Sequence, residues 1–317
     1  MRQFLIALNK GGIEAAFCGF LTMKKLYLIF LIVFLTIGTY AQNPTGYLIE
    51  AHSSYNALVN WTKQDIEVIG YGALDLREDR PYFQAKLMAR EAAKADAYRN
   101  LAETIKGVLV TSETTVENFV TESDFIRKRV DMFIQGANIV EEKELEGGGY
   151  AVKLRLSLSD SQDSNLSSLL LPEIQKKDKE ILSSSIQFAQ NVVDKPSFAK
   201  TKPDHLITGI VIDTHSLSVR PAMSPKIFSS DGKLIYGSSM VDPYRLQEST
   251  FVAYTRDIDT ALLLDRVGDN PVVIQAIGVS GTNQSDIVIS KADAEFLQQS
   301  NKASGFLEEC RVVIVIE

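Results

Sequence analysis

No apolar run in this sequence reaches the roughly 20 residues that a membrane-spanning helix needs. The run at 26–37 has 12 residues, follows Lys24 and Lys25, and leads into small residues up to Ala41. A basic start, a short apolar core and a small-residue exit are typical of a secretory signal peptide. We therefore predict a signal peptide over 23–41, an exported protein, and no stable membrane span after cleavage. The alternative is a membrane anchor that stays in place.

Cysteine is nearly absent as well, since the 317 residues include only Cys18 and Cys310. Cys18 falls within residues 1–22, which precede a better start at Met23 and are predicted to be a start-site overcall. No cysteine stands at the predicted cleavage site, so the sequence offers no lipid attachment site there. Cys310 then stands alone, no internal disulfide is expected, and the hydrophobic cores must stabilise the protein. Because Cys310 precedes the alternating run 311–316, we expect a buried, unreactive thiol.

Basic residues are fewer than acidic ones, with 33 Lys+Arg against 40 Asp+Glu and a net charge of −7. An acidic chain without a basic stripe argues against nucleic acid as a partner. The dense basic cluster is Arg127, Lys128 and Arg129, on a predicted helix beside Asp124 and Asp131. A salt-bridged helix face is the default interpretation of this cluster, and a partner-binding patch is the sharper alternative.

Length and composition favour two ordinary globular domains, since the chain is 45% hydrophobic. In the first, at 42–160, alanines recur every four residues in a predicted helix from Pro81 to about 106, with Gly107 as its C-terminal cap. We expect Ala93, Ala97 and Leu101 to lie at a helix–sheet contact. The other elements expected in this domain are strands at 65–72, 108–116, 138–145 and 150–158 and a helix that begins near Thr121.

A polar segment at 161–203, helical from about 169 to 193, is predicted to connect the first domain to the second. The second domain, 204–317, is expected to mix strands and helices again. Its predicted elements are strands at 205–213, 226–229, 233–236, 271–279, 286–289 and 312–316, with helices at 258–267 and after Ser290. The predicted fold class is therefore α+β: two α/β-type domains with mixed or antiparallel sheets packed by helices, joined by a partly helical connector.

The three histidines, His52, His205 and His215, give little evidence of a catalytic site. Asp213 and His215 share one face of a predicted strand, whereas Ser216 points to the other, so a Ser-His-Asp site is not favoured. A metal site there would need further ligands. We predict no cofactor, no metal site and no catalytic residue.

Glycine runs and paired acids also have simple structural interpretations. The run 147–149 lies between two predicted strands, where a hairpin turn suffices. The stretch 278–281 lacks the Lys-Ser/Thr of a phosphate loop and opens no predicted helix. The pairs 141–142 and 308–309 are expected to face solvent, because sequence alone cannot place two carboxylates across a cleft.

Several short motifs carry a family resemblance. They are 68–72, 92–101, 105–107, the Val- and Thr-rich run that follows, and 150–156. Together they resemble the bacterial LPP-twenty lipoprotein family, and the N-terminal module of flagellar assembly protein T looks similar. The likeness covers about 60–160 and departs from the family in lacking the cysteine at the cleavage site. It implies an envelope-associated protein without known catalysis, and some relatives support flagella or motility.

The second half also resembles an extension found in some of these relatives. The residues that carry this likeness are 208–213, 219–221, 224–227, 269–271, 289–294 and 310–315.

We therefore predict a non-catalytic exported protein, periplasmic or associated with the outer membrane. It is expected to bind envelope or flagellar proteins during assembly of such a structure. One alternative is a periplasmic small-ligand-binding protein with a pocket between the domains near Arg220 and Pro221. The other, less favoured, is a hydrolase that uses Asp213 and His215.

Overall fold

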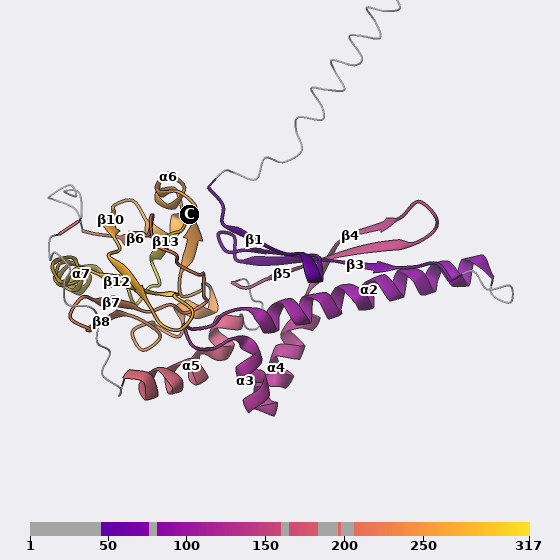
Figure 1. The fold of residues 1–317 in the computed structure, drawn as a ribbon, viewed down its shortest axis with the longest axis horizontal. Helices are drawn as coiled ribbons and strands as arrows, with labels where there is room; N and C mark the ends of the chain where they lie inside the picture. Colours follow the sequence, from indigo (N-terminus) through magenta and orange to yellow (C-terminus); the bar gives the residue numbers. More distant parts are fainter. Residues whose placement is uncertain (1–45, 76–80, 160–164, 183–195, 198–205) are drawn as a thin grey trace, which may run out of the picture. The chain divides into compact units, whose positions relative to one another are not determined.

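The computed structural model describes residues 46–75, 81–159, 165–182, 196–197 and 206–317 (Figure 1). The predicted start-site overcall, the predicted signal peptide and His205 lie outside these residues.

The first sheet has five antiparallel strands in the order β1-β2-β3-β5-β4. Its strands are β1 (Ile49–His52), β2 (Ala57–Asn60), β3 (Asp65–Gly72), β4 (Asn138–Glu144) and β5 (Tyr150–Ser157). The predicted strand at 65–72 and the predicted hairpin at 138–158 are confirmed. The sequence does not predict strands β1 and β2, because each has only four residues and no clear alternation.

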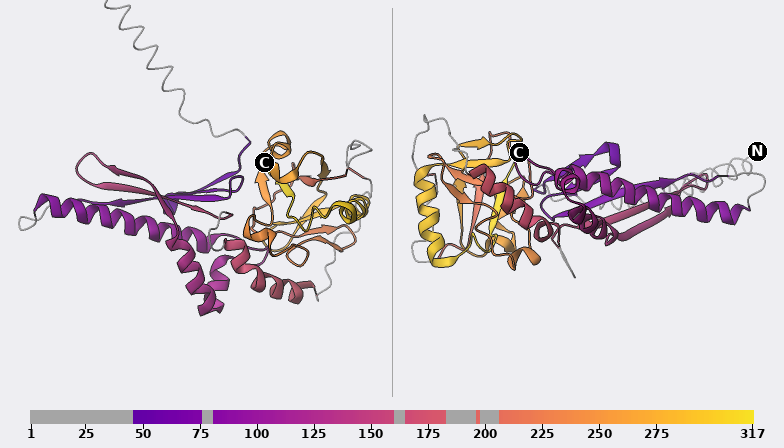
Figure 2. Two further views of the ribbon diagram at one scale, coloured as in Figure 1. Left: turned by 180° about the vertical axis from the view of Figure 1, so that it is seen from behind. Right: turned by 90° about the horizontal axis from the view of Figure 1, so that it is seen from below.

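Helix α2 (Tyr82–Gly107) runs along one face of this sheet (Figures 1 and 2). The alanine periodicity is confirmed, because the residues with the predicted spacing are buried: Ala85, Ala89, Ala93, Ala97, Leu101 and Ile105. The contact with β3 is close enough to require glycine, since a Cβ on Gly70 would lie 2.1 Å from the backbone nitrogen of Ala97. Small side chains on both elements therefore set the spacing between helix and sheet.

Two expectations near the end of α2 are wrong. Gly107 is the last helical residue rather than a left-handed cap, and Val108 follows it in an extended conformation. The predicted strand at 108–116 is instead a tight loop, in which Val110 N–H donates to the Thr114 carbonyl over 2.8 Å. Leu109 and Thr111 are buried in this loop as well as Val108 and Val110, so the alternation of branched residues does not mark a single buried face.

Two short helices follow the loop. Helix α3 (Val116–Glu122) begins with a capping box between Thr115 and Asn118, and α4 (Asp124–Gln135) begins after Ser123, whose hydroxyl accepts from the Ile126 N–H. A helix in this region is confirmed, but its start at Thr121 is wrong, because Thr115 and Ser123 provide the caps.

The second half of the chain contains two four-stranded sheets. A parallel sheet, in the order β10-β6-β13-β9, consists of β6 (Gly209–Asp213), β9 (Ala253–Thr255), β10 (Pro271–Gln275) and β13 (Val312–Val315). A mixed sheet, in the order β11-β12-β7-β8, consists of β7 (Ile227–Ser229), β8 (Leu234–Tyr236), β11 (Gly278–Ser280) and β12 (Asp286–Ile289). Helix α6 (Ile258–Leu262) packs on the parallel sheet and α7 (Lys291–Ser304) packs on β7.

Most predicted elements of this half are present, and the α+β class is confirmed. The single strand expected at 271–279 is two strands in different sheets, because the chain crosses between them at Ala276 and Ile277. The helix expected at 258–267 is interrupted, because Leu264 is extended ahead of a 3₁₀ turn that ends at Gly268.

Helix α5 (Leu166–Leu182) lies within the predicted connector and packs through Leu166, Leu169, Leu170, Leu171 and Ile174. Asp178 of this helix lies 2.8 Å from the ammonium of Lys226, and both side chains are buried. The described part of the connector is therefore attached to the second half by an apolar contact and a buried ion pair.

The loop after α2 docks on the second half of the chain. Its Leu109 and Val110 carbonyls accept from the backbone N–H groups of Met223 and Ser224 over 2.9 and 2.7 Å. The Ser112 hydroxyl donates to the Asp286 carboxylate over 2.6 Å. Burial raises the pKa of Asp286, and the Lys226 ammonium opposes that shift.

Candidate functional site

The predicted basic patch lies on α4, and its three side chains have different surroundings. Arg127 turns to Asp124, with 3.0 Å between guanidinium and carboxylate. Lys128 is exposed and makes no ion pair among the described residues, and the Arg129 guanidinium lies 5.6 Å from the Phe125 ring centroid. The default interpretation, a salt-bridged face, therefore holds for Arg127 alone.

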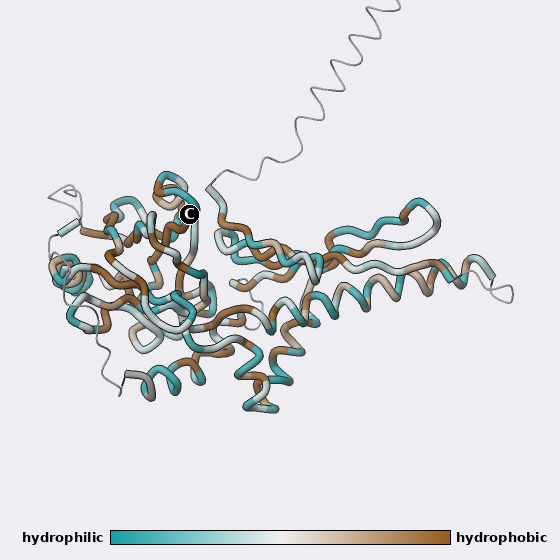
Figure 3. Tube along the Cα trace, in the orientation of Figure 1, coloured by the Kyte–Doolittle hydropathy of each residue, from teal (hydrophilic) through white to brown (hydrophobic). Residues whose placement is uncertain are grey.

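Phe125, Lys128, Arg129 and Met132 form the outer face of α4. Their spacing of three, four and seven residues places them on one side of a helix. Phe125 and Met132 are 66% and 63% exposed, whereas Ile126, Val130 and Ile134 on the opposite side are buried. Hydrophobic and hydrophilic residues alternate along this helix (Figure 3). The outer face thus combines two exposed apolar side chains with two cations.

The less favoured candidate site, Asp213 with His215, is a local turn. One oxygen of Asp213 accepts from the His215 backbone N–H over 3.0 Å and also contacts His215 Nδ1. Ser216 is exposed with a φ of 75°, and within the described residues its hydroxyl makes no hydrogen bond to His215. The three residues are not assembled as a nucleophile, base and acid.

The glycine run at 147–149 is the turn between β4 and β5, and Gly147 and Gly148 adopt φ angles of 92° and 88°. The stretch 278–281 is β11 and the turn that follows it. The hairpin turn predicted at 147–149 is therefore confirmed, and 278–281 opens no helix, as expected.

Three of the four carboxylates in the acidic pairs form hydrogen bonds or ion pairs. Glu142 accepts two hydrogen bonds from Arg90 of α2, Glu308 accepts from Asn301, and Glu309 pairs with Arg311 over 2.7 Å. Solvent exposure is confirmed for the pair at 141–142, whereas Glu308 and Glu309 are half-buried. That expectation is wrong for the second pair, because the hydrogen bonds and ion pair hold these carboxylates against the protein.

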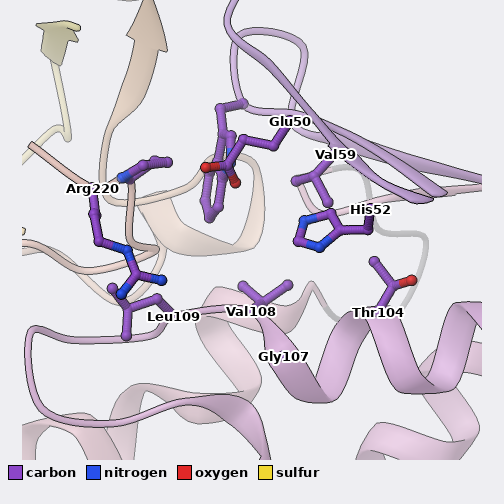
Figure 4. A pocket seen from close by; sticks show the side chains of 10 residues that line it. Glu50, His52, Val59, Thr104, Gly107, Val108, Leu109 and Arg220 are labelled. Carbon is purple, nitrogen blue, oxygen red and sulfur yellow. The ribbon is translucent and has the colours of Figure 1, made fainter. Parts of the chain in front are cut away.

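A pocket lies beside Arg220 and Pro221, at the position considered for a small ligand (Figure 4). Its volume is about 80 Å³. Polar side chains come from β1 (Glu50 and His52), from the end of α2 (Thr104) and from Arg220. The rest of the lining is largely apolar and includes Val59, Trp61 and Val108.

Sequence reasoning missed the β1 side of this pocket. His52 has no partner motif nearby in the sequence, and a four-residue strand gives too little pattern to orient Glu50 and His52 together. Their i, i+2 spacing is the available signal, because alternate residues of a strand share a face.

Two properties of the described residues bear on the remaining functional classes. Among them, no three His, Cys, Asp or Glu side chains are grouped as a metal site requires. None of the helices in the described ranges is long and apolar enough to cross a membrane.

Comparison with protein families assigns the two halves separately. Residues 75–157 match the LPP20 lipoprotein family. This region is an LPP20 lipoprotein domain. Residues 209–317 match the second domain of Treponema pallidum Tp0624. A comparison with curated proteins gives no match.

The family assignment confirms the resemblance noted in the sequence. The LPP20 match covers α2, α3, α4 and the β4–β5 hairpin, whereas β1, β2 and β3 precede it and complete its sheet. The match of residues 75–157 to a lipoprotein family points to a location in the cell envelope.

Proposed function

We propose that this chain is a non-catalytic envelope protein that acts by binding another protein through the outer face of α4. The LPP20 domain supports the envelope location. The exposed Phe125, Lys128 and Met132 and the half-buried Arg129 of α4 support the binding role. Envelope or flagellar assembly components are the proposed partners, with the protein exported to the periplasm or the outer membrane.

The observation that carries the proposal is the composition of this face. Phe125 and Met132 are among the more exposed large apolar side chains of the described residues. Aromatic residues, Met and Arg are enriched where proteins bind one another, and Phe125, Arg129 and Met132 supply all three. Because neither Lys128 nor Arg129 forms an ion pair among the described residues, an acidic and apolar partner surface complements this face.

A site-specific photo-crosslinker at position 128 tests the proposal in living cells, with Lys302 of α7 as the matched control position. Lys302 is also an exposed lysine on a helix and has no described ion pair. We expect a covalent adduct with one envelope protein from position 128 and not from position 302.

Charge reversal then tests the contact with the identified partner. In purified proteins, Lys128→Glu combined with Arg129→Glu is expected to weaken binding about tenfold or more, and Lys302→Glu is expected to leave it unchanged. Added salt is expected to weaken the wild-type complex. Equal adducts from both positions, or a complex insensitive to the double reversal, would remove the α4 face as the binding site.

A further inference from the structure

The pocket beside Arg220 brings opposite charges to one small space. The Glu50 carboxylate and the Arg220 guanidinium both extend into it, and His52 lies between the β1 strand and the end of α2 (Figure 4). One Glu50 oxygen accepts from the Trp61 indole N–H over 2.7 Å, and its other oxygen has no hydrogen-bond partner among the described residues. A free acceptor and a cation therefore face the same cavity.

Tertiary contacts hold the Glu50 side of the pocket in place. The Trp61 ring, which fixes Glu50, meets the Tyr254 ring edge-on, with 5.7 Å between centroids. The Tyr254 hydroxyl donates to the Ala222 carbonyl over 2.8 Å and accepts from the Ala222 N–H over 3.0 Å. The wall that carries Glu50 is thus tied to the segment that follows Arg220.

Hydrogen bonds also hold the Arg220 side, although the Arg220 residue is exposed to solvent. Its backbone N–H donates to the Gln284 carbonyl over 3.1 Å, and its guanidinium donates to Asn283 over 3.0 Å. Asn283 in turn donates to the Ser112 carbonyl through its backbone and its side chain. A site whose charged groups are fixed before binding loses little free energy in ordering them.

The balance of charge selects the class of ligand. A simple anion would attract Arg220 but repel Glu50, and a simple cation would do the reverse. A ligand with one ammonium and one carboxylate group pairs with both residues at once.

The size of the pocket limits the ligand further. Sites for drug-sized molecules have volumes of about 300–1,000 Å³, whereas this cavity has about 80 Å³. Val59 and Val108 line it with apolar surface, which suits a hydrogen or a methyl group as the side chain.

We propose that this pocket binds a small zwitterion, a free α-amino acid of the size of glycine or alanine. Glu50 receives the ammonium group and Arg220 receives the carboxylate, with His52 beside them. This site is independent of the outer face of α4 and goes beyond the proposed protein-binding function.

Titration calorimetry of the purified full chain tests the site with four probes: glycine, L-alanine, acetate and ethylammonium. We expect glycine or L-alanine to bind saturably with a Kd of about 1 mM or lower. Acetate and ethylammonium, which each carry one of the two charges, are expected to bind at least about tenfold more weakly.

Two pairs of variants separate the pocket from general effects. Arg220→Gln and Glu50→Gln are each expected to weaken zwitterion binding about tenfold, because each removes one charged partner. Arg256→Gln and Glu295→Gln alter exposed residues outside the pocket lining and are expected to leave binding unchanged. Circular dichroism confirms that each variant is folded.

Three results would overturn the proposal. The first is the absence of saturable binding of either amino acid. The second is acetate binding as tight as that of glycine with no effect of Glu50→Gln, which would indicate an anion site. The third is equal weakening by the pocket variants and their controls.

Discussion

At the scale of single residues, Cys310 shows how burial governs chemistry. Its side chain is fully buried, and burial raises the pKa of the thiol to about 11, against the opposing effect of the nearby Arg266 guanidinium. The thiolate is the reactive form of cysteine. Since the shift is upward, the folded protein holds the thiol protonated at neutral pH and above, as the sequence predicts for an unreactive cysteine.

The thiol of Cys310 is therefore expected to resist a disulfide reagent in the folded protein. In a Cys18→Ser variant at pH 8, reaction should be slow without denaturant and should reach completion once urea unfolds the chain. Absorbance of the released thiolate measures both rates. Leu263→Cys in the same variant is the control, because Leu263 is 84% exposed and a thiol there should react at once. Rapid reaction of folded Cys310 would contradict the prediction.

At the scale of elements, two glycines at α2 and β3 differ in how much the packing requires them. Gly70 lies under Ala97 with no room for a side chain, whereas a Cβ on Gly107 would meet no atom within 4 Å. Gly107 also has no positive φ angle. Gly70 is therefore required by packing, and Gly107 is required by neither packing nor backbone conformation.

Alanine substitutions separate these roles. Gly70→Ala is expected to lower the free energy of unfolding by about 1–3 kcal/mol or more, because the added methyl group forces helix and sheet apart. Gly107→Ala is expected to raise it by up to about 1 kcal/mol, because alanine loses less backbone entropy in a helix. Urea unfolding of the full chain measures both. Loss of stability in Gly107→Ala would restore the capping role that the sequence suggests.

Sequence periodicity predicts the helices and strands whose buried residues recur at regular spacing along their own sequence. The alanines of α2 and the alternation of β5 show their buried faces directly, and both are confirmed. The loop 108–116 has the same β-branched alternation, but backbone N–H groups at 223 and 224 supply its outer partners. The Glu50 side of the candidate pocket was not predicted for a related reason, since Glu50 and Arg220 line one pocket only through the tertiary fold. The sequence predicts a pocket near Arg220 and Pro221 but does not predict that Glu50 and Trp61 line it.

At the scale of the whole described region, one hydrophobic cluster contains residues of both family domains. Leu101 of α2 and Leu154 of β5, both within the LPP20 match, belong to the same cluster as Ile212 and Ile314 of the parallel sheet. The buried hydrogen bond from Ser112 to Asp286 joins the two matched regions across 174 residues of sequence. The domains that sequence similarity separates are thus expected to unfold together.

Urea unfolding of the full chain is expected to give one transition by fluorescence and by circular dichroism. Ser112→Ala should lower the midpoint of that single transition, with a loss of about 1–3 kcal/mol, because a buried carboxylate oxygen loses its donor. Ser54→Ala is the control, since Ser54 is exposed. Two separate transitions, or equal effects of the two variants, would show that the halves are stabilised independently.

The loop after α2 has a consequence for protein engineering. Its residues fall inside the LPP20 match, yet the carbonyls of Leu109 and Val110 find their donors in the other matched domain. A chimera that transplanted 75–157 alone would carry two open backbone acceptors and would leave β1, β2 and β3 behind. The smallest transplantable segment of this chain is therefore larger than the family boundary, and its recipient must supply two backbone N–H donors for the loop.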